Sequence, residues 1–344
     1  MVRITLMETV ARVKPANPFF LLIAVLLVVA GPMSAFADWR DEIGAFRIGI
    51  LAGGDPRTAM AQAEPFRLAI EEKLGLPVEI FPARDYAALV DASANSRIEY
   101  AVLSSTAFAL AYNRCECIEP LVIARSGDGT DGFSQILITR KDGPASLSEL
   151  AGRRIATIRT SAYGGLDIAL KQLAGEGLKP AEADLLRVNH RDEAIAALRD
   201  QRADALVGWS TMTGDPGDGY SRGTLRRIAE LEGGTSGYHV LWKSVFIAYR
   251  VHAVRKSLPG EARTQLRDLL SSMFEIDPVA YDSIEPIYGG GFIPARQGQF
   301  DPLTALLKPP AGDEQTDGSP GDAKAAEPQT GDAAAPEGAA GKQG

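Results

Sequence analysis

The sequence predicts a two-lobed α/β protein in which each lobe is a mainly parallel sheet flanked by helices. Short apolar strands alternate with amphipathic helices from Phe46 onward, and this alternation is typical of parallel strands covered by helices. One βα series is followed by a long strand, a second series and an apolar segment at residues 244–249 that returns the chain. An interrupted first lobe predicts a hinged clamshell, with lobe 1 at residues 44–138 and 247–307 and lobe 2 at residues 139–246.

The individual elements follow from the apolar pattern and from capping residues. A helix is expected from Thr58 to Leu74, where Gly75 and Pro77 end it. Asp85 is placed to cap the next helix. The other expected elements are strands at 46–51, 78–81, 100–103, 121–124, 134–140, 155–158, 185–188 and 203–207, and helices at 107–112, 165–176, 192–200 and 259–273.

The two ends of the chain are predicted to lie outside the lobes. Two basic residues precede an apolar run at 19–30, which is shorter than the roughly 20 residues that span a bilayer. A small-x-small motif ends at Ala37, so we expect residues 1–37 to be a signal peptide that is cleaved after Ala37, with retention as an anchor as the alternative. The protein would then be periplasmic. Residues 309–344 lack periodicity and are predicted to be a disordered acidic tail.

Composition and motifs exclude several classes of protein. The formal net charge is −8, so no broad basic surface for nucleic acid is indicated. The histidines His190, His239 and His252 lack metal-ligand spacing, and neither a nucleophile elbow nor a Walker or dinucleotide motif occurs. We therefore expect no cofactor, no metal and no enzymatic activity.

The only two cysteines, Cys115 and Cys117, are separated by one residue. A disulfide across so short a span is expected to be strained. Two ligands alone also make a poor structural metal site. Buried or idle thiols are therefore expected.

Two segments combine a predicted strand, a turn of hydroxyl-bearing residues and a predicted helix. The first backbone N–H groups of a helix lack intrahelical partners and the helix dipole adds positive potential, which suits an anion. The hydroxyls can add hydrogen bonds, although Ser and Thr are also common N-caps. The first turn consists of Ser104, Ser105 and Thr106, and the second of Thr160, Ser161, Ala162, Tyr163 and Gly164. We expect both turns to face one small anion.

Three further residues at the ends of predicted strands are candidates to contact the ligand or line the cleft, namely Arg57, Arg159 and Trp209. The alternatives are a solvated side chain for Arg57, a salt bridge for Arg159 and a cap on the core for Trp209.

A series of segments along the chain carries a family resemblance. In order they are FRIGI (46–50), RDYAAL (84–89), EYAVL (99–103), SELAGRRIA (148–156), His190 with AIAAL (194–198), ADA (203–205), LWKS (241–244), VRKSL (254–258) and GFIP (291–294). Together they resemble the phosphonate-binding component of ABC importers over about residues 44–307. The resemblance implies a type II periplasmic binding fold that captures a phosphate-like oxyanion or a phosphonate.

The resemblance also implies site residues. Tyr86 matches a tyrosine that reaches the ligand in the phosphonate binders. Ser161 and Gly164 match the first and last positions of the family's Ser-Thr-Ser-Gly anion turn. His190 matches a family position as well, with support of the following helix as the alternative.

The departures from the family pattern concern the ligand. Ala162 and Tyr163 replace the two hydroxyl-bearing middle positions of the anion turn, and Phe133 replaces a tyrosine of the aminoalkylphosphonate binders. Arg191 stands where those relatives carry a carboxylate for the ammonium group, and a guanidinium there would repel an ammonium. Asp192 is the alternative carboxylate after a one-residue shift. Aminoalkylphosphonates are therefore disfavoured as ligands.

These observations predict a monomeric exported solute-binding protein that closes two lobes on a small oxyanion. Its partner would be an ABC permease in the inner membrane. The alternative is a periplasmic sensing subunit that reports an oxyanion such as arsenite to a membrane histidine kinase. An enzyme on the same fold is the second alternative, which the absent catalytic motifs disfavour.

Overall fold

A computed structural model describes residues 38–159, 165–296 and 298–309. Helix α2 (Trp39–Ile43) belongs to an N-terminal unit of its own, and the second unit begins at Gly44. The predicted signal peptide at residues 1–37 lies outside the described part, as does the predicted acidic tail at residues 309–344 except for its first residue. Within that part, each helix is too short or too polar to cross a membrane.

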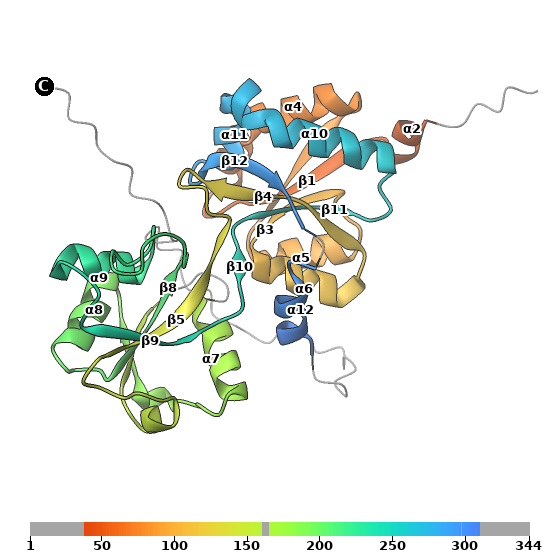
Figure 1. The fold of residues 1–344 in the computed structure, drawn as a ribbon. Helices are drawn as coiled ribbons and strands as arrows, with labels where there is room; N and C mark the ends of the chain where they lie inside the picture. Colours follow the sequence, from red (N-terminus) through yellow and green to blue (C-terminus); the bar gives the residue numbers. More distant parts are fainter. Residues whose placement is uncertain (1–37, 160–164, 297, 310–344) are drawn as a thin grey trace, which may run out of the picture. The chain divides into compact units, whose positions relative to one another are not determined.

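The first sheet has six strands among the described residues (Figure 1). They are β1 (Phe46–Leu51), β2 (Val78–Ala83), β3 (Tyr100–Leu103), β4 (Ile118–Ser126), β11 (Val251–Arg255) and β12 (Gly289–Pro294), in the order β12-β4-β11-β3-β1-β2. β1 pairs in parallel with β2 and β3, whereas β11 and β12 run antiparallel to their neighbours. The sheet is therefore mixed, because of two strands that return late in the chain: β11 inserts between β4 and β3, and β12 adds to the edge beside β4.

Helices cover both faces of the first sheet (Figure 1). They are α3 (Pro56–Gln62), α4 (Glu64–Leu74), α5 (Tyr86–Ala94), α6 (Ser105–Cys115), α10 (Gly260–Ile276), α11 (Pro278–Ile284) and α12 (Asp301–Leu307). The single helix expected at 58–74 is two helices that meet at Ala63, since Pro65 lacks the N–H that a continuous helix would use. The predicted cap is confirmed: Asp85 Oδ1 accepts from the backbone N–H of Ala88 at 2.7 Å.

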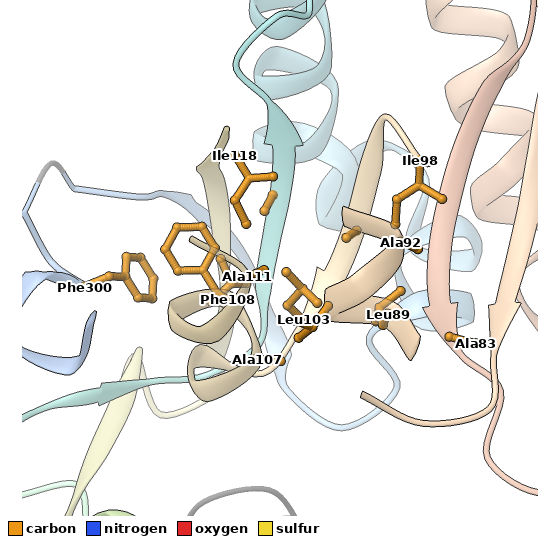
Figure 2. Close-up of a cluster of buried hydrophobic side chains, with 14 of the residues drawn as sticks. Ala83, Leu89, Ala92, Ile98, Leu103, Ala107, Phe108, Ala111, Ile118 and Phe300 are labelled. Atoms are coloured by element: carbon orange, nitrogen blue, oxygen red, sulfur yellow. The ribbon is translucent and has the colours of Figure 1, made fainter. Parts of the chain in front are cut away.

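Between α5, α6 and the sheet lies a continuous apolar core (Figure 2). Leu89 of α5, Leu103 of β3 and Phe108 of α6 are buried there. Gly49 lets α5 approach β1, because a Cβ at this position would come within 2.6 Å of Leu89. This packing places the first residues of α5 and α6 at the carboxyl ends of the parallel strands.

The second sheet also has six strands within the described residues. They are β5 (Gly132–Arg140), β6 (Ile155–Ile158), β7 (Leu185–Val188), β8 (Ala205–Ser210), β9 (Tyr238–Lys243) and β10 (Ile247–Ala248). β6, β7 and β8 are parallel, while β5 runs antiparallel to β8, β9 and β10. Helix α7 (Gly165–Gly175) packs on one face, and α8 (Arg191–Arg199) and α9 (Thr224–Glu232) pack on the other.

The chain passes between the two sheets through β5 and β10, which pair at Phe133↔Ile247 (Figure 1). The return segment expected at 244–249 contains only the two residues of β10, and the chain then forms β11 inside the first sheet. His252 and Arg255 interrupt the apolar run of β11, so its pattern did not indicate a buried strand. The lobe boundaries at 138/139 and 246/247 stay a prediction.

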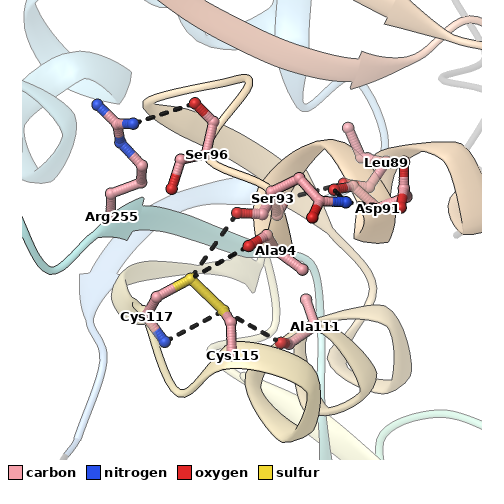
Figure 3. The surroundings of a disulfide bond; sticks show 10 residues. Leu89, Asp91, Ser93, Ala94, Ser96, Ala111, Cys115, Cys117 and Arg255 are labelled. Atoms are coloured by element: carbon pink, nitrogen blue, oxygen red, sulfur yellow. Dashed lines mark hydrogen bonds between the residues drawn. A yellow bond between two sulfur atoms is a disulfide. The ribbon is translucent and has the colours of Figure 1, made fainter. Parts of the chain in front are cut away.

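Cys115 and Cys117 form a disulfide, which corrects the expectation of free thiols (Figure 3). Helix α6 ends at Cys115, and Glu116 adopts a left-handed conformation with φ 50°. This turn brings the two Cα atoms to 5.0 Å, inside the range of about 4.4–6.8 Å that disulfides use. The prediction of free thiols was wrong because the left-handed turn at Glu116 leaves no signal in the sequence.

A row of buried polar side chains, Tyr100, His252 and Glu285, is linked by hydrogen bonds in the core of the first lobe. The side chains of His252 and Glu285 are fully buried, and His252 Nε2 lies 2.8 Å from Glu285 Oε1. Burial lowers the pKa of His252, so the ring is neutral at pH 7. Nε2 therefore donates to the carboxylate, and Nδ1 accepts from the Tyr100 hydroxyl, whose pKa burial raises.

Removing the disulfide should lower stability only moderately. In the chain-entropy model, closing a three-residue loop lowers the conformational entropy of the unfolded chain, which stabilises the folded state by about 1.6 kcal/mol. We expect the Cys115→Ser/Cys117→Ser variant to lose about that much free energy of unfolding in urea titrations. Thiol titration of the unreduced protein in denaturant is the control. Two reactive thiols before reduction would contradict the disulfide.

The buried histidine should make stability depend on pH between about 7.5 and 5.5. In the unfolded chain the imidazole takes up a proton near pH 6.5, whereas the folded state resists this, so the free energy of unfolding falls as the pH falls. One proton corresponds to a slope of at most about 1.4 kcal/mol per pH unit. The variant His252→Asn should flatten the slope of the free energy of unfolding against pH. The variant His190→Gln, at an exposed position, should leave this slope unchanged. Equal slopes in all three proteins would refute this linkage.

Candidate functional site

A pocket of about 390 Å³ opens at the carboxyl end of β1. The loop after β1, the start of α3, the start of α5 and the segment after α11 surround it. Thr58, Tyr86, Arg250 and Ser283 are among the residues that line it. Carboxyl ends of parallel strands are the usual ligand edge of an open α/β sheet. We call this cavity the Arg250 pocket.

Local structure positions the polar residues of this pocket. Tyr86 is the first residue of α5, directly after the cap Asp85. Asp55 caps α3, and its carboxylate accepts from the backbone N–H groups of Arg57 and Thr58 and from the Thr58 hydroxyl. The Asp55 carboxylate is thus engaged in capping. Burial raises the pKa of Tyr86, so its phenol stays protonated at neutral pH.

Arg250 brings a positive charge to the pocket. It lies between β10 and β11, and its Nη1 donates to the carbonyl of Ile284 at 3.2 Å. Its Nε lies 3.6 Å from Oε1 of the buried Glu285. The Glu285 carboxylate raises the pKa of Arg250, which keeps the guanidinium charged. The row of buried polar side chains that includes His252 and Glu285 therefore ends at Arg250, which lines the pocket.

Aromatic side chains connect this region to the second sheet. Phe133 of β5 lies 5.6 Å from Trp209 of β8 and 6.1 Å from Tyr249, measured between ring centroids. Tyr249 stacks on Tyr288 at 4.7 Å. Burial raises the pKa of both tyrosines. The predicted site residue Phe133 thus belongs to an aromatic row that links the two sheets.

The hydroxyl turn of the first lobe has partners within the protein. Ser104 caps α6 and accepts from the backbone N–H of Ala107 at 3.1 Å. Ser105 is buried and donates to the carbonyl of Ala248 at 2.7 Å, and Thr106 is buried as well. Ser105 therefore ties α6 to β10. A ligand contact by these three residues stays a prediction.

The predicted turn of the second lobe, Thr160, Ser161, Ala162, Tyr163 and Gly164, lies outside the described residues. The strand before it and the helix after it are confirmed, as β6 ends at Ile158 and α7 begins at Gly165. Arg159 is exposed, and its backbone N–H donates to the carbonyl of Val188.

The segment at His190 is described in full. His190 is exposed at the N-cap of α8 without a side-chain capping bond. Arg191 approaches Asp192 only at 4.0 Å. Asp192 accepts two hydrogen bonds from Arg227, at 2.9 and 2.6 Å. The alternative carboxylate for a ligand ammonium is therefore already paired.

Sequence reasoning missed Arg250, Glu285, Tyr249 and Tyr288. Tyr249 and Arg250 had a usable signal, because Tyr249 ends the segment that was expected to return the chain and Arg250 directly follows it. Glu285 and Tyr288 lie some 35 residues later, after α11, and nothing in the local pattern connects them to this edge.

Comparison with known proteins identifies relatives in sequence and in structure. A family model described as "ABC transporter, phosphonate, periplasmic substrate-binding protein" matches residues 48–300. The phosphonates-binding periplasmic protein of Escherichia coli strain K12 is 27% identical over 119 residues, which are 34% of this chain and 35% of that protein. The match thus spans about a third of the length of that relative.

Solved structures show the same fold. The Xanthomonas citri protein XAC2383 bound to ATP superposes with a TM-score of 0.53 at 18% identity, over 76% of this chain and 95% of that chain. Its chloride-bound structure gives a TM-score of 0.51 at 19% identity, over 76% and 96%. At such identities the likeness concerns the fold alone. The predicted two-lobed type II fold is confirmed, and the family model covers most of the sequence. The chain belongs to the family of periplasmic substrate-binding proteins of phosphonate ABC transporters.

Proposed function

We propose that the protein binds a small oxyanion of the phosphonate, phosphite or phosphate class in the periplasm and delivers it to an ABC permease. The observation that carries this proposal is the Arg250 pocket, where a charged guanidinium and a protonated tyrosine line a cavity at the ligand edge of the sheet. A pocket of this volume falls within the range of small-molecule sites, about 300–1,000 Å³.

Local charge supports an anionic ligand although the whole chain is acidic. The formal net charge is −8, so an anion must be attracted by a local cation. Asp55 at the pocket is engaged in capping, and Asp192 is paired with Arg227. Both carboxylates already accept hydrogen bonds within the protein, while Arg250 and Arg191 supply positive charge that would repel a ligand ammonium. The aminoalkyl class is therefore disfavoured within the proposed ligands.

The second half of the proposed site is the turn from Thr160 to Gly164. Its place between a buried strand and a helix supports oxyanion binding by backbone N–H groups. Ala162 and Tyr163 lack the hydroxyl donors of the family turn, so the backbone and Ser161 would supply most of the hydrogen bonds. Phe133 and His190 are proposed to line the ligand rather than to react with it.

Partners and location follow from the family in the same proposal. In this proposal the protein is a monomer that closes on its ligand, and the permease then binds the closed form. Export would use residues 1–37, with cleavage after Ala37. The sensing alternative with a histidine kinase would keep the pocket and change only the outer surface. We propose a binding role without catalysis.

A ligand panel tests the class of ligand. Phosphate, phosphite, methylphosphonate, sulfate, arsenite, a neutral sugar and an amino acid are compared by thermal shift. A phosphorus oxyanion at a hundred times its Kd should stabilise the folded state by about 2.7 kcal/mol, which raises Tm by roughly 5 °C. The neutral compounds should leave Tm unchanged. Stabilisation by a sugar or an amino acid, with none by the oxyanions, would overturn the proposal.

A pair of variants tests the position of the anion. Ser161→Ala should weaken binding of methylphosphonate or phosphate about tenfold or more, because a hydrogen bond to a charged group is lost. Arg57→Ala, in an exposed segment of α3, is the matched control and should change Kd by less than about twofold. Isothermal titration calorimetry measures both. Equal and small effects would place the anion elsewhere.

A further inference from the structure

We propose that Arg250 directly contacts an acidic group of the ligand, and that it makes the protein selective for phosphonates whose organic part is neutral or acidic. This inference rests on the proposed function, since it concerns the same ligand. It adds a binding residue and a narrower ligand class. Arg250 is not part of a recognisable sequence motif. Its proposed role follows from its surroundings in the fold.

The guanidinium of Arg250 has N–H donors that no described residue uses. Arginine has five N–H donors, and among the described residues Arg250 uses Nη1 for a single hydrogen bond to Ile284. Its contact with Glu285 is a 3.6 Å approach through Nε, longer than a hydrogen bond. The side chain retains 29% of its accessible surface and lines the pocket. A planar donor set of this kind suits the oxygens of a carboxylate or a phosphonate.

The buried carboxylate explains why Arg250 is held there. Glu285 is fully buried, and its Oε2 has no hydrogen-bond partner among the described residues. His252 fixes Oε1 through a hydrogen bond of 2.8 Å. A buried carboxylate needs a nearby cation, and Arg250 supplies it. The carboxylate also offsets part of the charge that Arg250 presents to the pocket.

The pocket discriminates by charge. An ammonium group in the pocket would meet the guanidinium of Arg250. The Asp55 carboxylate also lines the pocket and keeps its charge, but three hydrogen bonds hold it against the start of α3. The volume of about 390 Å³ leaves room for an organic substituent in addition to an acidic group. Phosphonoacetate, which carries two acidic groups, therefore represents the favoured class, and 2-aminoethylphosphonate represents the disfavoured one.

The test uses two variants that differ only at position 250. Arg250→Met alone would leave Glu285 buried without its cation and risks unfolding the protein. Glu285→Gln keeps the shape and the acceptor for His252, and it removes the charge that offsets Arg250. The double variant Arg250→Met/Glu285→Gln removes both charges together. Arg114→Met, at an exposed position near the end of α6, is the control for losing an arginine.

Calorimetry with methylphosphonate, phosphonoacetate and 2-aminoethylphosphonate gives the readout, and thermal melting checks that each variant is folded. The wild type should bind phosphonoacetate at least tenfold tighter than 2-aminoethylphosphonate. Glu285→Gln should bind it as tightly or tighter. The double variant should bind phosphonoacetate about 10- to 100-fold more weakly than Glu285→Gln and should lose the discrimination. Arg114→Met should behave like the wild type.

The outcomes separate this inference from the proposed function. If phosphonates bind but the double variant stays within twofold of Glu285→Gln, Arg250 does not contact the ligand and only the inference fails. The same holds if Glu285→Gln weakens binding as much as the double variant does, because a merely structural role gives that result. If 2-aminoethylphosphonate binds the wild type most tightly, the proposed selectivity is wrong. If none of the phosphorus oxyanions binds any protein, the proposed function fails and the inference fails with it.

Discussion

The close pairing of β5 with β10 is the constraint on which the site depends. At Gly132 a Cβ would come within 2.4 Å of the carbonyl oxygen of Ile247, so glycine is needed for the strands to approach. Ser105 donates to the carbonyl of Ala248 in the same short strand, which ties α6 of the first lobe to the crossing. Arg250 follows two residues later. The crossing therefore connects the sheets and also sets where the pocket receives its cation.

The electrostatics of the pocket follow from a carboxylate that the fold buries. A fully desolvated Glu285 is costly unless an opposite charge lies near, and the two nearby groups have different roles. His252 stays neutral and orients the carboxylate by a hydrogen bond, whereas Arg250 brings the compensating charge. An acidic protein thereby holds a positive group at the carboxyl edge of its first sheet. The same carboxylate that retains the arginine also moderates its attraction for an anion.

Local patterns predicted the elements better than they predicted the site. Alternating apolar strands and amphipathic helices carry their own signal, and Asp85 was recognisable as a cap from its place before a helix. The disulfide was not predicted because it depends on the left-handed conformation of Glu116, and the sequence contains no signal for that conformation. Glu285 was missed for another reason. Its partners come from strands that are distant in sequence, and only the antiparallel insertion of β11 brings His252 beside it.

The carboxylates considered for a ligand ammonium show why residue identity alone was insufficient. From the sequence, Asp192 was an available carboxylate one position after Arg191, and a substrate ammonium remained an option. In the fold, Arg227 reaches across from α9 and makes two hydrogen bonds to Asp192. Asp55 accepts hydrogen bonds from neutral groups at the start of its own helix, so it is held in place but keeps its negative charge. The Arg227 guanidinium offsets much of the Asp192 charge, so Asp192 attracts a ligand ammonium less than its formal charge suggests. The proposed selectivity therefore depends on which charges the fold leaves only partly paired, and Arg250 approaches Glu285 no closer than 3.6 Å.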